Sequence, residues 1–128
     1  MKLGYVILYV PDVPAAVAFY ERAFGLKNRR MIEDQYAEME TGATALAFVH
    51  EEFVADFVAP FHRNRQSDRS AGIEVALVST EVAAAYKTAI AAGALPILEP
   101  TQKPWGQIVS YVRDLNGCLV EICSPTDV

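Results

Sequence analysis

The sequence lacks any long uninterrupted hydrophobic run. Its N-terminal apolar stretch, YVILYV, ends at Pro11-Asp12, far short of the roughly 18 apolar residues that cross a membrane. No small-residue cleavage site follows, so we interpret the stretch as a first strand and not as a signal peptide. We therefore expect a cytoplasmic protein with no membrane partner.

Positive charge is also scarce. Lysine and arginine together number 11 against 16 acidic residues, which gives a net charge of −5. Nucleic-acid binding depends on a basic surface that neutralises phosphates. The one basic cluster, His62 to Arg69, also contains Asp68, and we interpret it as a solvated linker. We expect no nucleic-acid partner.

Residues that ligate metals or act as nucleophiles are few. Cys118 and Cys123 lie five positions apart on an expected strand, and an odd spacing points two side chains to opposite faces. They cannot share a metal or form an easy disulfide, so we interpret them as buried free thiols. With His50 and His62 as the only histidines, a histidine-based triad has little support. The sequence contains neither a glycine-rich phosphate loop nor a nucleophile elbow.

What the chain does contain is a repeat. One copy opens with YVILYVPD at Tyr5, and the other opens with EVALVSTE at Glu74. The offset from Tyr5 to Glu74 is 69 positions, the same as from Asp12 to Glu81 (81 − 12 = 69). A fixed offset across a strand and the helix after it predicts a duplicated structural module.

Each copy has the pattern of a β-α-β-β-β module. In the first copy we expect strands over 3–10, 26–31, 36–41 and 44–50, and a helix capped by Asp12 and closed by Gly25. In the second we expect strands over 73–78, 95–98, 107–112 and 119–124, and a helix from Ser79 or Thr80 to Gly93. At 128 residues and 52% hydrophobic content, we predict a single α+β domain. Module one covers about 1–52, a packed linker about 53–71 and module two about 72–128.

The tandem modules resemble the vicinal oxygen chelate superfamily, which includes glyoxalase, the bleomycin-resistance proteins and the extradiol dioxygenases. The most specific segments are YVPDVPAAVAFYERAFGL at the first helix and KPWGQIVSYVRDLNGCLVEICSP at the end. The resemblance implies a U-shaped, partly open mixed sheet around a cleft, often at a homodimer interface. We accordingly expect a homodimer that binds a small molecule.

The resemblance also implies where metal ligands would lie. The metalloenzymes of this superfamily place one ligand on the first strand and one on the last strand of each module, which here gives Tyr5, Phe48, Glu74 and Glu121. Phe48 follows from aligning Leu46-Ala-Phe48 with Leu119-Val-Glu121, an offset of 73. The second module then carries about four extra residues, which we assign to 100–105.

Strand alternation supports a polar wall formed by these positions. One face of each strand is apolar or thiol and suits packing under the helices, whereas every polar exception falls on the other face. Only Glu74 and Glu121 can bind metal among the four positions. His50 shares the strand face of Phe48, about 6.6 Å away, and we place it at the strand end or cleft rim. We favour no metal; a weakly held divalent ion on Glu74 and Glu121 is the alternative.

Two carboxylates that face one partly apolar wall repel each other, and burial disfavours their charge. Both effects raise at least one pKa. The pair could hold a cationic or hydrogen-bond-donating ligand, or act as general base and acid. A salt bridge from Glu74 to Arg30 or Arg113 is the structural alternative. Trp105 either stacks at the cleft mouth or caps the core.

Two functions follow. The first is binding of a small organic ligand, without a tightly held metal, in a cleft lined by Tyr5, Phe48, Glu74, Trp105 and Glu121, with His50 at its rim. The alternative is a glyoxalase-type lyase or isomerase with Glu121 and Glu74 as catalytic residues around nickel, zinc, manganese, magnesium or iron. Whether the protein is an enzyme stays open at this point.

Overall fold

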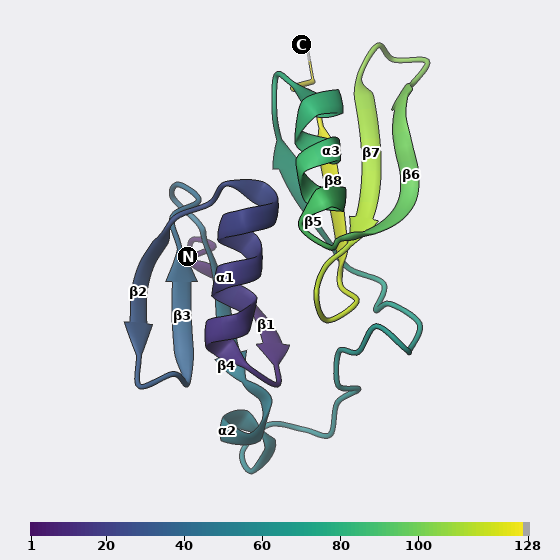
Figure 1. Cartoon of the computed structure of the whole chain (residues 1–128). Helices are drawn as coiled ribbons and strands as arrows, with labels where there is room; N and C mark the ends of the chain where they lie inside the picture. The colour runs from purple at the N-terminus through teal and green to yellow at the C-terminus, as the bar shows by residue number, and fades with distance from the viewer. Residues whose placement is uncertain (127–128) are drawn as a thin grey trace. The chain divides into compact units, whose positions relative to one another are not determined.

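The computed structural model describes residues 1–126. It divides the chain into two compact units, Met1–Arg63 and Asn64–Val128. The boundary falls inside the 53–71 segment that the sequence predicts as a linker. Each unit contains one β-α-β-β-β module (Figure 1), so the predicted duplication is confirmed.

The first unit is a four-stranded sheet with one long helix. Its elements are β1 (Tyr5–Val10), α1 (Val13–Phe24), β2 (Asn28–Ile32), β3 (Tyr36–Met39), β4 (Ala45–His50) and a short α2 (Glu51–Ala55). The strand order is β1-β4-β3-β2. Strand β1 runs parallel to β4, and the other pairs are antiparallel.

The second unit repeats this topology. Its elements are β5 (Glu74–Val78), α3 (Val82–Ala91), β6 (Leu95–Gln102), β7 (Ile108–Arg113) and β8 (Leu119–Cys123). The strand order is β5-β8-β7-β6, with β5 parallel to β8. Two open, mixed sheets with few helices confirm the predicted α+β class. None of the helices in residues 1–126 is long and apolar enough to span a membrane.

The two long helices begin differently. Asp12 caps α1 as predicted, because its Oδ1 accepts a hydrogen bond from the Ala15 amide at 3.0 Å. Gly25 closes α1 in the left-handed conformation, with φ 67°. At α3 the capping position is Glu81, which makes no side-chain cap bond. The expected cap Ser79 lies two residues earlier, where its hydroxyl accepts from the Glu81 amide.

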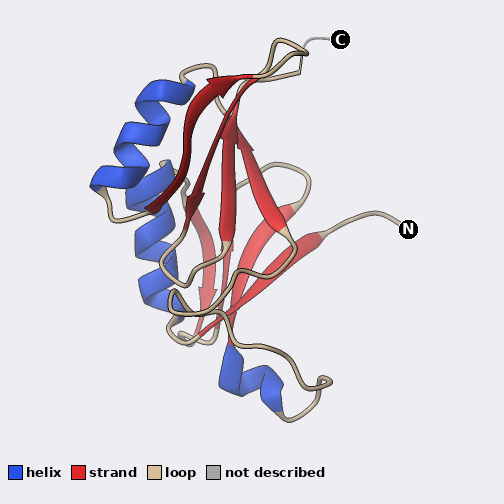
Figure 2. Cartoon of the chain, turned by 90° about the vertical axis from the view of Figure 1, so that its right-hand side faces the viewer, coloured by secondary structure: helices blue, strands red, loops and turns tan. Residues whose placement is uncertain are grey.

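In each unit the helix covers one face of its own sheet (Figure 2). In the first unit, Tyr20 of α1 packs on Phe48 of β4 with ring centroids 4.9 Å apart. In the second, Val120 and Ile122 of β8 are buried. We call the opposite face of each sheet its helix-free face.

A single arginine anchors the start of the second unit. The Arg113 guanidinium donates to the backbone carbonyls of Arg65, Gln66 and Asp68, at 3.3, 3.1 and 2.6 Å. Gly117 allows this arrangement, since its φ is +87° and a Cβ there would overlap the Arg113 guanidinium and lie 2.5 Å from the Arg65 carbonyl oxygen. The 64–68 segment is thus fixed to the β7–β8 turn.

Candidate functional site

Two glutamates face the same way on the second sheet. In the parallel ladder Glu74 is opposite Leu119, and Ala76 is opposite Glu121. Because alternate residues of a strand share a face, Glu74 and Glu121 are diagonal neighbours on the helix-free face. A hydrogen bond with Glu121, burial and the Glu121 charge together raise the pKa of Glu74 to about 7. The pair therefore holds a proton near neutral pH.

Tyr111 completes this group from the neighbouring strand. It is directly opposite Glu121 in the β7–β8 ladder, and its hydroxyl donates to Glu121 Oε1 at 3.3 Å. Burial, followed by the charges of the two glutamates, raises the pKa of Tyr111 to about 12. The phenol is therefore a protonated donor at neutral pH. We call Glu74, Tyr111 and Glu121 the carboxylate cluster.

No cation neutralises the carboxylate cluster. Within residues 1–126, no ion pair joins Glu74 or Glu121 to a lysine or arginine. Arg113, one of the two partners considered from the sequence, is occupied by backbone carbonyls. Arg30, the other, belongs to the first sheet. The salt-bridge alternative for Glu74 is therefore wrong.

A thiol lies beside the carboxylate cluster. Cys123 is two residues beyond Glu121 on the same strand face and is buried. Burial and the neighbouring Glu121 raise its pKa, so the thiol stays protonated and is a poor nucleophile. Cys118 is also free, which confirms the prediction of two unpaired thiols.

Phe48 is not on the helix-free face, contrary to the sequence prediction. Its side chain is 0% exposed and packs on Tyr20 of α1. It is a core residue of the first unit, and it cannot contact a ligand on the opposite face.

A register error of one residue explains this correction. Tyr5 is opposite Ala45 in the first ladder, and Glu74 is opposite Leu119 in the second. The true offset between β4 and β8 is therefore 74 (119 − 45), so Ala47 and not Phe48 corresponds to Glu121. A slip of one residue moves every side chain of a strand to the other face.

The other predicted residues lie at separate places. Tyr5 is on the helix-free face of the first sheet and is 53% exposed. His50 ends β4 as expected, but it serves as the N-cap of α2, accepting from the Glu52 amide at 3.1 Å. Trp105 is in the β6–β7 turn, 66% exposed, and its Nε1 donates to Gln107. This exposure excludes the core-capping alternative for Trp105.

The four superfamily ligand positions do not fit a metal in this chain. With the corrected register they are Tyr5, Ala47, Glu74 and Glu121, of which only the two glutamates are usual ligands. In residues 1–126 no group of three or more histidine, cysteine, aspartate or glutamate side chains could hold a metal ion. Catalytic metal sites generally need three protein ligands. The donor set is thus too small for the metal that the resemblance implies.

Sequence reasoning missed a second polar group. Glu38 lies on the helix-free face of the first sheet, opposite Ala47, and is only 4% exposed. Arg29 and Tyr36 both bond to its carboxylate. Alternation along 36–39 shows that Tyr36 and Glu38 share a face. The sequence gives no sign of which face is covered by α1.

Comparison with known proteins places this geometry in a family context. The family model described as "Glyoxalase/Bleomycin resistance protein/Dioxygenase superfamily" matches residues 2–122. No curated protein matches the chain.

Solved structures with the same fold are numerous. A glyoxalase-related enzyme from Fulvimarina pelagi is 21% identical, with TM-score 0.81 over 98% of this chain and 88% of that one. A glyoxalase/bleomycin resistance protein/dioxygenase family enzyme from Burkholderia phytofirmans PsJN is 21% identical, with TM-score 0.76 over 97% and 98%. TioX from Micromonospora sp. ML1 is 24% identical, with TM-score 0.69 over 97% and 98%. At these identities the likeness establishes the fold alone.

Proposed function

Because this chain belongs to the glyoxalase/bleomycin resistance protein/dioxygenase superfamily, we propose that it binds a small organic ligand through the carboxylate cluster of the second sheet. The ligand carries a cationic or hydrogen-bond-donating group, such as an ammonium, next to an apolar body. Binding requires no metal ion. This proposal extends the family assignment to a ligand class.

The observation that carries the proposal is the uncompensated carboxylate pair. Glu74 and Glu121 share one proton near pH 7 and have no arginine or lysine partner within residues 1–126. Two partly desolvated carboxylates in contact are unfavourable unless a proton or a cation lies between them. A ligand ammonium can replace that proton and accept both carboxylates as hydrogen-bond partners. Tyr111 keeps Glu121 oriented through its hydroxyl.

Apolar surface surrounds the carboxylate cluster. Val78 and Ala76 follow Glu74 on the same face of β5, and Val78 is exposed. Leu119 precedes Glu121 on the same face of β8. Binding sites for small molecules typically combine such apolar surface with a few polar groups. An aromatic or aliphatic ring attached to the ammonium would contact these side chains.

A thermal-shift panel on chelator-treated protein tests the proposal. We expect benzylammonium compounds to raise the Tm of the wild type, and their neutral alcohol isosteres to leave it unchanged. A ligand at 100 times its Kd stabilises by about 2.7 kcal/mol. Glu74→Gln and Glu121→Gln should remove the response, whereas Glu81→Gln, a charge-matched exposed control on the same unit, should retain it.

Two outcomes would contradict the proposal. One is an equal response to ammonium and alcohol. The other is a rise with nickel, zinc, manganese or iron that disappears in Glu121→Gln, which would establish a metal site. On the resemblance alone we also propose a cytoplasmic homodimer, for which sedimentation equilibrium and cell fractionation are the checks.

A further inference from the structure

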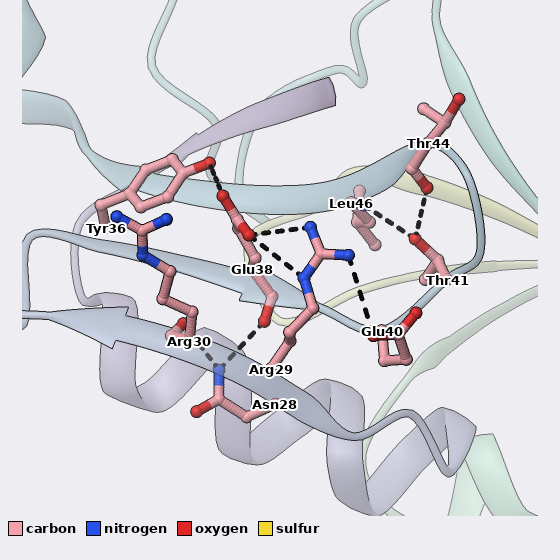
Figure 3. A network of polar contacts seen from close by, with 9 residues as sticks. All are labelled: Asn28, Arg29, Arg30, Tyr36, Glu38, Glu40, Thr41, Thr44 and Leu46. Atoms are coloured by element: carbon pink, nitrogen blue, oxygen red, sulfur yellow. Dashed lines mark hydrogen bonds and ion pairs between the residues drawn. The ribbon is translucent and has the colours of Figure 1, made fainter. Parts of the chain in front are cut away.

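Two consecutive arginines lie on the same face of the first sheet. The β2–β3 ladder pairs Asn28 with Met39 and Arg30 with Glu38, so one extra residue is inserted between Asn28 and Arg30. In a regular strand Arg29 and Arg30 would point to opposite faces. The bulge changes this alternation, and Figure 3 shows the two guanidinium groups on either side of Glu38. Both are therefore on the helix-free face.

Arg29 is held in a fixed position. Its Nε and Nη2 donate to Glu38 Oε1 at 3.2 and 2.8 Å, and the Tyr36 hydroxyl donates to Glu38 Oε2 at 2.7 Å. These bonds from Arg29 and Tyr36 lower the pKa of Glu38, which stays ionised although it is buried. Nη1 of Arg29 has only a loose contact, 3.7 Å, with the exposed Glu40. The guanidinium thus retains donor capacity on its outer edge.

Arg30 is the uncommitted cation of this group. Its side chain is exposed, and within residues 1–126 it forms no ion pair or side-chain hydrogen bond. Its positive charge lowers the pKa of Glu38 and opposes the rise in that of Tyr36, which shows that it lies close to both. After Glu38 neutralises Arg29, the charge of Arg30 remains.

An exposed ring lies on the same face. Tyr5 of β1 contributes to the raised pKa of both Arg29 and Tyr36 through its charge. Strand β4 runs between β1 and β3, and its residues on this face include Ala45 and Ala47. Short side chains therefore separate Tyr5 from Tyr36 and the arginines.

We propose that this face binds a small aromatic carboxylate. Its carboxylate accepts hydrogen bonds from Arg30 and from the outer edge of Arg29, displacing Glu40, and its ring packs against Tyr5. Arginine suits this role because its planar guanidinium matches a carboxylate in a bidentate manner. The site goes beyond the proposed function, since it lies on the other sheet and selects the opposite charge.

Benzoate is the probe, and the full chain is titrated at low salt and pH 7 by NMR, with the amide and arginine Nε signals observed. We expect saturable shifts at Arg29, Arg30 and Tyr5. Arg30→Gln should weaken benzoate binding at least fivefold, and Arg30→Lys should recover part of the loss. Lys27→Gln removes an equal charge from an exposed position just before β2, and it should change the affinity less than twofold.

The result that overturns the proposal is benzoate binding that Arg30→Gln leaves unchanged, or shifts that fall outside the first sheet. Benzamide binding as well as benzoate would refute the ionic contact. Inorganic phosphate binding the same residues as tightly as benzoate would refute selection of an aromatic carboxylate. Because Arg30 is exposed and unpaired, Arg30→Gln should fold, which an unchanged amide spectrum elsewhere verifies. Loss of benzylammonium binding in Glu121→Gln is a separate readout, so the two sites can fail independently.

Discussion

Substituting Glu121 by glutamine should return the titration of Glu74 to the ordinary range. A hydrogen bond with Glu121 is the largest cause of the raised Glu74 pKa, and the Glu121 charge adds to it. A pKa of about 7 means that about half of the Glu74 carboxyls are protonated at pH 7. At the ordinary value of 4.5 only about one in 300 would be. Glu121→Gln removes the charge and offers an amide donor, so the Glu74 pKa should fall toward 4.5.

The assay is a carbon-detected NMR titration of the glutamate side-chain carboxyls from pH 3 to 9. Glu74→Gln assigns the signal, and Glu81→Gln is the control that should leave it unchanged. A wild-type Glu74 that titrates near 4.5 would refute the reasoning. So would a Glu121→Gln variant in which Glu74 still titrates near 7, because the elevated pKa would then come from burial and not from the pair.

The same shift has a consequence for stability with a definite sign. The folded-state pKa of Glu74 lies above its unfolded value, so the folded protein binds more protons between pH 4.5 and 7. The stabilisation from this group is full below pH 4.5 and is lost as the pH rises through 7. Because Glu74 is exposed, solvent screening reduces its size. Urea denaturation across this range should show a steeper loss in the wild type than in Glu121→Gln.

Three further results are expected from urea denaturation. Gly117→Ala should cost about 2 kcal/mol or more, because it combines a φ of +87° with overlap on the Arg113 anchor, whereas Gly106→Ala, with φ +95° and open space around it, should cost only about 1 kcal/mol; equal losses would contradict the anchoring role. Phe48→Ala should cost about 3–5 kcal/mol as a core truncation, whereas Trp105→Ala should stay within about 0.5 kcal/mol, and the reverse order would contradict the observed burial. Tyr36→Phe should cost about 1–3 kcal/mol through its bond to an ionised, buried carboxylate, and no loss would contradict the Glu38 network.

The elements and the duplication could be predicted from the sequence because their signals are local. Asp12 and Gly25 mark the ends of α1 by their capping chemistry, and the Tyr5-to-Glu74 offset holds in the structure. The facing of Glu74 and Glu121 was also predictable, since a charged residue alternating with apolar ones identifies the exposed side of a strand. The joint position of these two acids on one face rests on this alternation.

The fourth strand shows where this reasoning ends. ALAFVH is apolar at nearly every position, so its pattern does not specify which residues face α1, and only pairing of Ala45 with Tyr5 resolves it. The Arg29–Arg30 bulge is likewise invisible in the sequence, because it depends on the partner strand. Alternation alone predicts opposite faces for two adjacent residues. Both failures come from pairing between strands, which local patterns do not encode.

The most direct measurement of the central claim is an amide NMR titration of the full chain with benzylammonium at pH 7. A cation that replaces the shared proton should shift the signals of Glu74, Tyr111 and Glu121, on β5, β7 and β8, and should lower the pKa of Glu74. Benzyl alcohol should shift none of them. Shifts confined to other strands, or none at saturating concentration, would contradict a ligand site on the carboxylate cluster.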